Sequence, residues 1–595
     1  MNDSTKKPAS LAGELDRHWL RLTLIAWLAI SIWFLFDRWN YVHWLSLGDT
    51  DDNMRLMQVR ALLNGQDWYD LRQYRLNPPT GFDIHWSRLV DLPIAALILA
   101  FKPFVGMAQA ERLACGIAPL LPLSLAMIGI AATARRLVNA HAWPLAIMFL
   151  LFCYGAMSMF MPERIDHHGW QLAMLSLTLA GLTDPKAVRG GAIAGVASAV
   201  SLTIGLEMLP YCALAGAIIA LRWVQDRAEA PRMSVYALTL AGGSTLGFAA
   251  FASYANRVAR CDALTPVWLT VMIAAGALLF LLARIDPERR AARLGLAVAA
   301  GAVIAIGFAL MFPQCLGRPE QVSPELQRNW LSMIREARPI YIQPLRNALP
   351  LAILPVVGLI GACLATWRAR FTPRFTIWAS TLPFCVAADC LLLWQTRAGP
   401  SAQLLALPGA TALGWIVLPW CLQHRSIFVR VFGTVATFAI VSGLLAGLPF
   451  EKLQFARPSK RVQTVDNASG RCPTIPALAP LNRLAPQTVF TFIDLGPRLI
   501  TVTHHNAVAG PYHRNGDAIL DVQHAFGGSA DTFRTIAKRH GATLLLLCPN
   551  MAESTIYRSR NPGGFYDQLA HGHRPGWLEP LPMPKKSPLR LWRIH

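Results

Sequence analysis

Charged side chains are scarce in this sequence of 595 residues. Asp, Glu, Lys and Arg make up only 15% of the chain, whereas 54% of its residues are hydrophobic. A soluble domain carries about 25% charged residues, so the composition excludes an ordinary soluble protein. Acidic residues are scarcer than basic ones, 34 against 55, which gives a net charge of +21. We interpret this excess as the Lys and Arg of cytoplasmic loops, and we expect no nucleic acid as a partner.

Cysteine motifs for metal binding are also missing. The 11 Cys residues have no CxxC or Cys/His spacing, which excludes a zinc finger. Most of them lie in apolar runs, where cysteine behaves as a small hydrophobic residue. Cys472 and Cys548 lie in a polar region and could form a disulfide if that region is extracytoplasmic. The first apolar segment lacks a small-residue cleavage site, so we expect a retained membrane helix rather than a signal peptide.

Long apolar runs recur between positions 19 and 449. Because a membrane-spanning helix needs about 20 apolar residues, the runs predict a polytopic α-helical membrane protein with about 13 transmembrane helices. The expected spans are 19–36, 112–133, 143–161, 170–184, 190–206, 207–223, 233–255, 264–284, 293–312, 348–367, 374–394, 401–421 and 428–448. The segment 92–105 is shorter and contains Lys102 and Pro103, so we predict that it does not cross the membrane.

The positions of the basic residues support this count. When 92–105 is not a span, the basic loops, such as the one with Arg135 and Arg136, all face the cytoplasm, as the positive-inside rule requires. The same count places two large loops, 37–92 and 313–347, and the C-terminal region on the external side. Counting 92–105 as a span would reverse every later loop. We therefore predict a multi-pass protein of a bacterial inner membrane.

The C-terminal part has a different pattern. Runs at 488–493 and 543–547 are typical of buried strands, and 529–540 has a helical pattern with a Ser/Asp start. Alternating strands and helices indicate a small α/β domain. We therefore predict a transmembrane domain over 1–449 and an extracytoplasmic α/β domain over 450–595.

Two acidic clusters adjoin predicted spans. The first is Gly48-Asp49-Thr50-Asp51-Asp52-Asn53, and the second is Glu163-Arg164-Ile165-Asp166-His167-His168. Three neighbouring Asp residues repel one another unless a cation or an Arg neutralises them, and Arg55 and Arg60 are local candidates. A helix N-cap is the competing explanation. Carboxylates and imidazoles brought together could hold a divalent cation such as Mg²⁺ or Mn²⁺.

Other polar residues have weaker signals. The loop 37–92 is rich in Trp and Tyr, which an interfacial aromatic belt would explain. Glu207 and Asp389 lie within apolar runs, and we interpret them as polar contacts near a lipid path. The histidines at 504, 505, 513 and 524 could line an acceptor groove or bind a phosphate, but loop turns around Gly510-Pro511 are the simpler explanation.

Two motifs carry a resemblance to a known family. The stretches "TDDNMRLMQVRALL" and "RIDHHGW" resemble motifs of the catalytic subunits of archaeal and bacterial oligosaccharyltransferases, in the GT-C superfamily of glycosyltransferases. The resemblance implies a GT-C fold and a divalent metal bound by Asp51, Asp166 and His168. It also implies that Asp51 is catalytic.

Three further positions match the family more loosely. "MIREARP" is similar to the family's motif in a long external loop and implies a catalytic or acceptor-facing Glu336. Arg397, at the end of a late span, corresponds to the Arg that binds the donor phosphate. "FIDLG" is similar to the family's acceptor-recognition motif, which implies acceptor binding by Asp494. Neither Trp of that motif is present here, so recognition of an Asn-x-Ser/Thr sequon is not expected.

The resemblance thus implies a metal-assisted membrane glycosyltransferase. Its donor would be a polyprenyl-(di)phosphate-linked sugar or oligosaccharide, and its acceptor would lie on the external face of the membrane. The missing Trp pair leaves open whether that acceptor is a protein or instead a lipid, lipopolysaccharide or exopolysaccharide. A non-enzymatic lipid or glycan transporter, or flippase, is the alternative outside enzymes.

Overall fold

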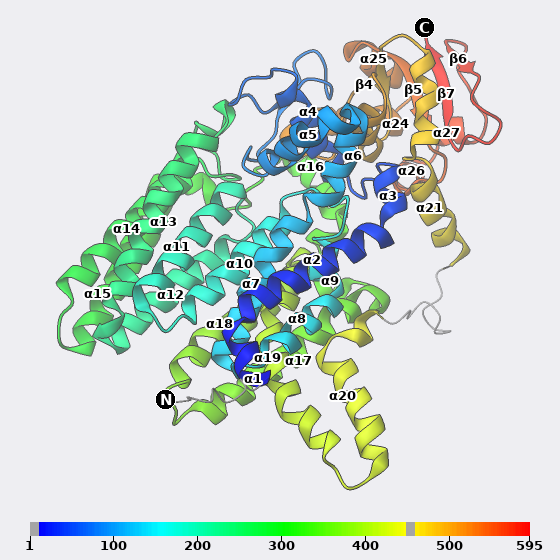
Figure 1. Cartoon of the computed structure of the whole chain (residues 1–595). Coiled ribbons are helices and arrows are strands. Elements are labelled where there is room, and N and C mark those ends of the chain that lie inside the picture. Colours follow the sequence, from blue (N-terminus) through cyan, green and yellow to red (C-terminus); the bar gives the residue numbers. More distant parts are fainter. Residues whose placement is uncertain (1–10, 448–458) are drawn as a thin grey trace.

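The computed structural model describes residues 11–447 and 459–595. Within these residues a bundle of long helices carries a small sheet domain at one end, which we call the domain end (Figure 1). Helix α1 (Leu11–Arg17) lies near the opposite end. The predicted domain boundary between residues 449 and 450 falls outside the described residues, so the division into 1–449 and 450–595 stays a prediction.

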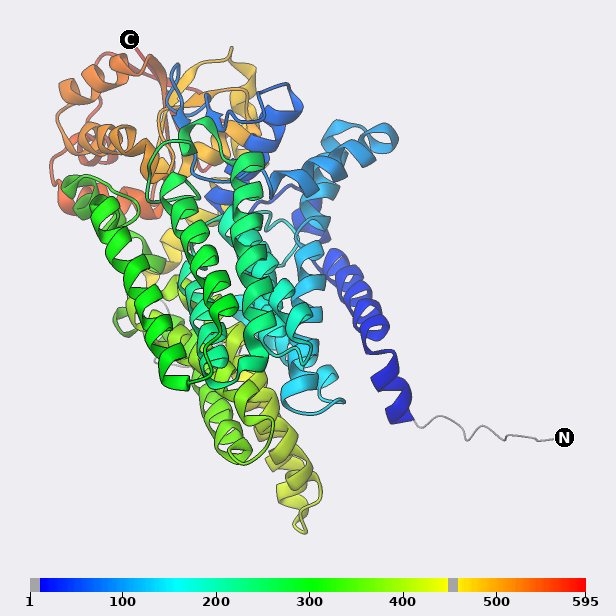
Figure 2. The ribbon, with the colours of Figure 1, turned by 90° about the vertical axis from the view of Figure 1, so that its left-hand side faces the viewer.

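Nine helical segments of the described chain are long and apolar enough to cross a membrane. They are α2 (Trp19–Asp37), α6 (Met107–Ile117) with α7 (Leu120–Leu137), α11 (Ala187–Ile204), α13 (Ala230–Phe251) with the turn before it, α14 (Pro266–Ile285), α15 (Arg290–Met311), α17 (Leu345–Ala369), α18 (Phe375–Trp394) and α19 (Gly399–Leu422) with the turn before it. Figure 2 shows α13, α14 and α15 side by side. The chain is a multi-pass membrane protein, as predicted.

The four other predicted spans coincide with shorter helices. They are α8 (Trp143–Phe152) with α9 (Tyr154–Ser158), α10 (His168–Leu182), α12 (Leu209–Gln225) and the stretch Val429–Val441, which ends in α20 (Thr434–Val441). The helix over 143–161 is interrupted at Cys153, whose backbone leaves the helical conformation. The polytopic helical fold is confirmed, although four of the predicted spans are shorter than expected.

The segment 92–105 behaves as predicted. It forms α5 (Asp91–Val105), which is not among the nine long apolar segments of the described chain. The chain reverses at Gly106, whose φ of 76° favours glycine, and α5 then packs against α6. The two helices make a hairpin beside the domain end, so the chain does not cross the bundle here.

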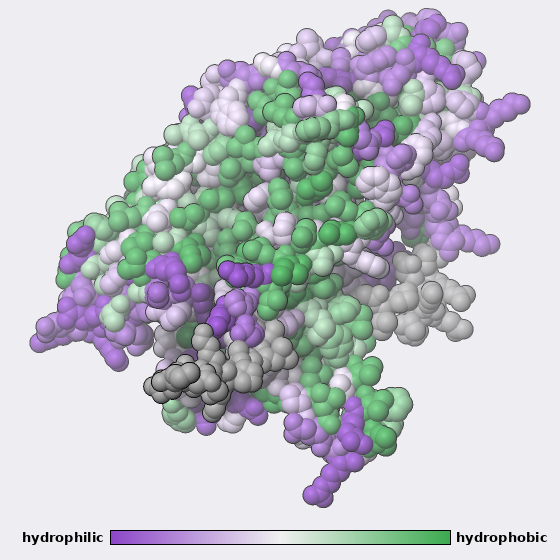
Figure 3. All heavy atoms as spheres, in the orientation of Figure 1, coloured by the Kyte–Doolittle hydropathy of each residue, from purple (hydrophilic) through white to green (hydrophobic). Residues whose placement is uncertain are grey.

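The predicted cytoplasmic loops meet one another at the end of the bundle away from the sheet domain. Arg136 forms an ion pair with Asp184 at 2.9 Å, and Arg374 donates to the Val138 carbonyl at 2.9 Å. Figure 3 shows hydrophobic residues across the bundle and hydrophilic residues gathered over the sheet domain and at the far end. The segregation of the basic loops is what the positive-inside pattern requires.

The C-terminal domain is a five-stranded sheet with helices packed around it. The strand order is β4 (Asn506–Ala507), β3 (Thr488–Phe490), β5 (Ala542–Leu547), β7 (Arg590–Ile594) and β6 (Leu578–Leu581). Strands β4, β3 and β5 are parallel, whereas β7 pairs antiparallel with both β5 and β6. The helices are α23 (Gly496–Val502), α24 (Gly516–Gly527), α25 (Ala530–Arg539), α26 (Ala552–Arg560) and α27 (Phe565–Ala570).

The predicted elements of this domain are largely confirmed. β5 occupies the expected strand at 543–547, and α25 occupies the expected helix at 529–540. Ser529 caps α25 by accepting a bond from the Thr532 amide at 3.1 Å. The strand expected over 488–493 ends early because Ile493–Leu495 turns into a 3-10 helix.

The loop 37–92 is folded, and it shares a hydrophobic core with the C-terminal domain. It contains α3 (Trp39–His43), α4 (Thr50–Leu63), β1 (Arg72–Gln73) and β2 (Phe82–Asp83). Met54 and Trp86 of this loop belong to the same buried cluster as Phe490 and Ile500. Arg75 donates to three carbonyls around the end of α23. This packing fixes α4 against the domain.

Two disulfides occur in the described chain, both at the domain end. Cys472 and Cys548 are paired, which answers the question that the sequence left open. Cys261 and Cys315 are also paired, and this bond was not expected because both residues adjoin apolar runs. It joins the loop after α13 to the loop after α15.

Candidate functional site

The two acidic clusters meet at the domain end of the bundle. The first forms the N-terminus of α4, where Asp49 is the N-cap. The second immediately precedes α10. The amide of Asp166 donates to Oδ1 of Asp52 at 3.1 Å, and both of these Asp residues are buried. The prediction that the clusters share one face of the membrane domain is therefore confirmed.

Arg164 joins the two clusters electrostatically. Its Nη1 lies 2.8 Å from Oδ2 of Asp49 and 3.0 Å from Oδ2 of Asp52. Its Nη2 lies 2.8 Å from Oδ2 of Asp166. We call Asp49, Asp51, Asp52, Asp166, Arg164 and His168 the site cluster. One guanidinium pairs with three carboxylates and Asp51 is a fourth, so the cluster keeps an excess of negative charge.

The sequence suggested different arginines for this role, and that suggestion is wrong. Arg55 lies on the other face of α4, where it is fully buried and bonds Asp91 at 2.8 Å. Arg60 bonds Glu111 at 2.8 Å, on α6. Both are close to the acidic cluster in sequence, but the helix turns them away from it. Arg164 replaces them from a position more than a hundred residues later.

Asp51 is the free carboxylate of the site cluster. It lies in the first turn of α4, and it has no ion pair or hydrogen bond to its side chain within the described residues. Burial, followed by the charges of Asp49 and Asp166, raises the pKa of Asp51 well above its ordinary value, against the effect of Arg164. The Glu336 carboxylate also raises it, so the predicted catalytic pair lies within electrostatic reach.

Asp166 and His168 are neighbours, as their i,i+2 spacing suggested. The His168 amide donates to Oδ1 of Asp166 at 3.0 Å, and Nε2 of His168 lies 3.9 Å from Oδ2. Burial alone would raise the pKa of Asp166, but Arg164 and the nearby imidazoles outweigh it and lower this pKa. Asp166 is thus an ionised carboxylate beside an imidazole.

A second imidazole site adjoins this pair and was missed by sequence reasoning. His167 Nε2 lies 2.9 Å from Glu207 Oε1, and Gln171 donates to Glu207 Oε2 at 2.6 Å. One ligand atom each from His167, His168 and Glu207 lie within 4.8 Å of one another. The only sequence signal for this site is Glu207, a glutamate inside an apolar run. Its position in that run indicates only a polar contact near a lipid path.

The donor set fits a divalent cation. Carboxylates outnumber cations in the site cluster, and the buried Nδ1 of His167 has no hydrogen-bond partner among the described residues. Carboxylate oxygens suit Mg²⁺ and Mn²⁺, and imidazole nitrogens favour Mn²⁺ over Mg²⁺. Of the predicted ligands, Asp166 and His168 are neighbours, and Asp51 is linked to Asp166 by electrostatic interaction. The ligand atoms that lie within 4.8 Å of one another here belong to His167, His168 and Glu207, a group that does not include Asp51 or Asp166.

Glu336 and Arg397 form an ion pair with each other. Nη2 of Arg397 lies 3.0 Å from Oε1 of Glu336, and both side chains are partly exposed. The Thr396 amide donates to the Arg338 carbonyl at 2.9 Å, which ties the loop 313–347 to the start of α19. The two residues were selected from separate motifs, and the fold brings them together.

Asp494 lies at the rim of the same region. It is exposed in the 3-10 helix Ile493–Leu495, whose amides at Ile493 and Asp494 donate to the carboxylate of Glu553 at 2.9 and 3.1 Å. The surrounding protein partly desolvates Asp494, and with the charge of Asp49 this raises its pKa. The C-terminal domain therefore presents Asp494 toward the site cluster.

A second charged group joins the domain to the bundle, and we call Asp262, His513, Arg514 and His85 the clamp cluster. Arg514 bonds both oxygens of Asp262, at 2.7 and 2.8 Å, and His513 Nε2 lies 2.7 Å from Oδ2. The His85 and His513 rings are 4.7 Å apart. One ligand atom each from His85, Asp262 and His513 also lie within 4.8 Å of one another. Here the single carboxylate is already fully neutralised.

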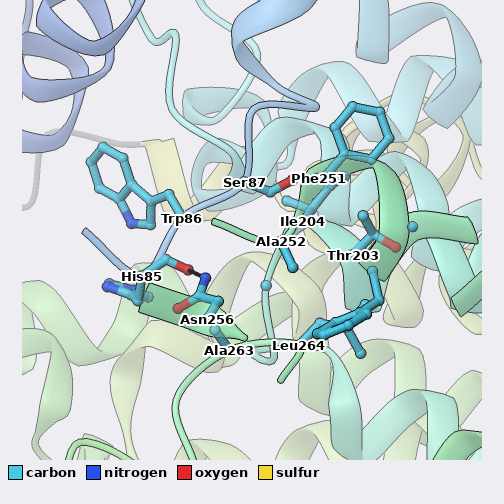
Figure 4. A pocket seen from close by; sticks show the side chains of 13 residues that line it. His85, Trp86, Ser87, Thr203, Ile204, Phe251, Ala252, Asn256, Ala263 and Leu264 are labelled. Atoms are coloured by element: carbon cyan, nitrogen blue, oxygen red, sulfur yellow. Dashed lines mark hydrogen bonds between the residues drawn. The ribbon is translucent and has the colours of Figure 1, made fainter. Parts of the chain in front are cut away.

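The cavity beside the clamp cluster is too small for a substrate. Figure 4 shows it between His85, the end of α11 at Thr203 and the end of α13 at Phe251, with Asn256 bonded to the His85 carbonyl. Its volume is about 10 Å³, which holds roughly one water molecule. The cavity is a packing gap between elements.

The other C-terminal histidines support loops. His504 and His505 bond the carbonyls of Leu484 and Leu481 at 2.8 and 2.9 Å. His524 pairs with Glu325 at 2.6 Å. These contacts favour the loop-turn interpretation of this part of the sequence over a phosphate site.

The bundle, its domain end and the arrangement of the site define a membrane protein with the oligosaccharyltransferase-like GT-C fold. The chain is similar to the archaeal oligosaccharyltransferase AglB from Archaeoglobus fulgidus in complex with an inhibitory peptide and a dolichol-phosphate. That structure matches with a TM-score of 0.68 and 15% identity, over 95% of this chain and 73% of the other.

Two further structures of the Archaeoglobus fulgidus oligosaccharyltransferase agree. One is tethered to an acceptor peptide containing the NVT sequon, and it matches with a TM-score of 0.67 and 15% identity over 97% and 76% of the two chains. The other contains Zn and sulfate and matches with a TM-score of 0.61 and 14% identity over 93% and 71%. No protein-family model and no curated protein sequence matches this chain.

Proposed function

We propose that this protein is a membrane glycosyltransferase that moves a sugar or oligosaccharide from a polyprenyl-(di)phosphate to an acceptor. The observation that carries the proposal is the site cluster itself, at the end of a GT-C bundle. Its four carboxylates and one imidazole are accompanied by a single guanidinium, which pairs with three of the carboxylates. Excess negative charge at that position suits a cation that neutralises a phosphate leaving group.

The substrates follow from the fold and the position of the site. The similar AglB structure contains a dolichol-phosphate, which supports a lipid-linked donor whose chain lies between helices here. The basic loops at the opposite end support an orientation with the domain end outside a bacterial inner membrane. The acceptor, a protein or a glycan, then approaches from the external side.

Asp51, Asp166 and His168 would hold the Mg²⁺ or Mn²⁺ ion, and Glu207 lies close enough to assist. Such an ion would supply electrostatic stabilisation of the leaving phosphate. Arg164 keeps Asp49, Asp52 and Asp166 in place by its three short contacts. The cluster therefore enters the reaction already ordered, and little reorganisation is needed when the donor binds.

Arg397 and Glu336 would act on the substrates. When the donor arrives, its phosphate replaces Glu336 as the partner of Arg397, through charge-assisted hydrogen bonds. Glu336 is then free to face the acceptor, which Asp494 orients from the rim. The acceptor attacks the anomeric carbon, the bond to the phosphate oxygen breaks, and Asp51 takes the proton of the acceptor.

Substitution of the two central carboxylates tests the proposal. We expect Asp51→Ala and Asp166→Ala each to abolish transfer from purified polyprenyl-diphosphate-oligosaccharide, while the proteins remain folded in the membrane. The matched control is Asp466→Ala, because Asp466 is an exposed acid on α21 (Lys460–Arg471), away from the cluster. If both Asp51→Ala and Asp166→Ala transfer glycan at the wild-type rate, the assignment of these residues to the active site is wrong.

A further inference from the structure

A groove lies between α3 of the first loop and α22 (Ile475–Leu478) of the C-terminal domain. Its volume is about 330 Å³, at the lower end of the ~300–1,000 Å³ that is usual for ligand pockets. Asn40, Tyr41, Trp44 and Ser46 form one wall, and Thr474 and Ile475 belong to the other. The groove is far larger than the water-sized cavity of Figure 4.

The lining has a specific chemistry. Two aromatic rings are half exposed there, 49% for Tyr41 and 51% for Trp44, and beside them lie an amide and two hydroxyl side chains. No lining residue carries a charge. Aromatic faces with neutral hydrogen-bonding groups suit a ligand that is apolar on its ring faces and polar at its edges, which is the chemistry of a sugar. Phosphate and charged peptide side chains find no counter-charge.

A neighbouring cation, Arg38, does not change this conclusion. Arg38 lies over the Tyr41 ring at 5.1 Å, so it covers one face of that ring. Its charge is paired with Asp37, at 3.4 Å. The groove therefore offers the indole of Trp44 as its main aromatic surface.

The far wall of the groove is held rigidly. The disulfide between Cys472 and Cys548 anchors the chain two residues before Thr474. Arg498 donates to the Pro473 carbonyl at 2.7 Å and to Asn53 of α4 at 3.1 Å. Because the wall is ordered before a ligand arrives, binding loses little conformational entropy.

The groove lies close to the candidate active site along the chain. Ser46 on its wall precedes Asp49, the N-cap of α4, by only three residues. Three extended residues span at most about 10 Å. The side chain of Asn53, which Arg498 contacts, belongs to the same first turns of α4 as Asp51. A ligand in the groove would thus reach the site cluster.

We propose that this groove binds a saccharide unit of the acceptor, so that the protein glycosylates a glycan and not a peptide. The inference rests on the proposed transferase function. A hydroxyl group of the bound glycan attacks the anomeric carbon of the donor, the bond from that carbon to the phosphate oxygen breaks, and the hydroxyl proton passes to Asp51. The products are an extended glycan and the polyprenyl (di)phosphate.

Direct binding tests the groove without relying on catalysis. The full-length protein in detergent is applied to an array of bacterial surface oligosaccharides with unmodified peptides printed alongside. We expect binding to a subset of the saccharides and at least a tenfold loss with Trp44→Ala, a smaller loss with Thr474→Val and partial retention with Trp44→Phe. Trp39→Ala is the matched control, because Trp39 is a 45% exposed residue of the same helix outside the groove.

The results of the array distinguish a saccharide-binding groove from a peptide-binding groove and from a membrane-contacting aromatic surface. Binding to peptides alone, or equal saccharide binding by wild type and Trp44→Ala, overturns the proposal. An effect of Trp44→Ala on binding to phospholipid vesicles without any saccharide signal overturns it in favour of an interfacial belt. Asp51→Ala should still bind saccharide on the array. If saccharides bind but no transfer from any donor occurs, the groove stands and the transferase function fails.

Discussion

The site cluster and the clamp cluster contain the same kinds of side chain, yet they differ in charge balance. Each lies between the helix bundle and the first loop or the C-terminal domain, and each combines carboxylate, imidazole and guanidinium. In the site cluster three Asp residues share the single guanidinium of Arg164, and a fourth, Asp51, has no ion pair among the described residues. In the clamp cluster the single carboxylate of Asp262 receives both Arg514 and His513.

The difference in balance indicates different roles. The carboxylate of Asp262 is paired with two side chains, Arg514 and His513. Burial alone would raise the pKa of Asp262, but hydrogen bonds from these two side chains outweigh it and hold the pKa well below its usual range. Nothing remains for a cation to neutralise. In the site cluster burial, followed by the charges of Asp49 and Asp166, raises the pKa of Asp51. Additional positive charge would therefore balance this cluster. Spacing alone would have made both clusters candidate metal sites.

The largest expected effect separates the two clusters by metal binding. We expect Asp166→Asn to weaken Mn²⁺ binding by at least about tenfold, because it removes an ionised ligand. Asp262→Asn should leave the affinity unchanged within about twofold, since the clamp cluster has no surplus charge. Electron paramagnetic resonance of the purified protein titrated with Mn²⁺ measures both. Equal losses in the two variants would show that charge balance does not distinguish the clusters.

The second prediction concerns stability, for which we expect the clamp cluster to matter more than the site cluster. Arg514→Ala leaves Asp262 buried without its guanidinium, which costs about 3–5 kcal/mol for a buried pair. We expect a lower unfolding temperature and faster proteolysis of the C-terminal domain, with Mn²⁺ affinity preserved. Arg539→Ala is the control, because its ion pair with Asp521 is exposed and such pairs contribute only about 0–1 kcal/mol. If the Arg514→Ala protein is as stable as this control, the clamp cluster does not stabilise the C-terminal domain.

Sequence patterns predicted the membrane bundle well because each span is encoded locally. Apolar runs located the helices at all 13 predicted spans as far as the structure describes them. The orientation of the loops, which depends on 92–105 not being a span, stays a prediction. The α/β character of the C-terminal part was also readable from β5 and α25. Strands β6 and β7 were missed because they are short and their apolar residues are interrupted by Pro580 and by charged residues. The pairing of β7 with β5 is also a long-range contact.

The candidate site was only partly predictable for a related reason. Asp51, Asp166 and His168 stand in local motifs, so the motifs found them. Arg164 was passed over in favour of Arg55 and Arg60, because helical phase decides which Arg faces the acids and proximity in sequence does not. Glu207, the clamp cluster and the disulfide between Cys261 and Cys315 depend on contacts between distant segments, which one sequence does not reveal.

The smallest predicted effect is a pH dependence specific to the site cluster. Glu163 is buried behind the cluster with both carboxyl oxygens unpartnered among the described residues, and its φ is 76°. Burial, with the nearby charge of Asp52, raises its pKa from 4.5 to about 9. Between these values the folded protein holds a proton that the unfolded chain releases. Stability therefore falls as pH rises through this window, by at most about 1.4 kcal/mol per pH unit.

Two variants isolate that dependence from the clamp cluster. Glu163→Gln should reduce the slope by up to about 1.4 kcal/mol per pH unit, so that its stability relative to the wild type rises from pH 6 to pH 8. The slope that remains belongs to groups such as Asp52 and Glu553, whose pKa values burial raises to about 7 and about 8. Glu163→Gly should add a pH-independent gain, because glycine adopts a positive φ without strain. Asp262, whose pKa is lowered, contributes stability that is full above the unfolded pKa of about 4 and lost only in acid. Its Asp262→Asn variant should therefore run parallel to the wild type between pH 6 and pH 8. A slope in Glu163→Gln as steep as that of the wild type would exclude Glu163 as a source of the dependence.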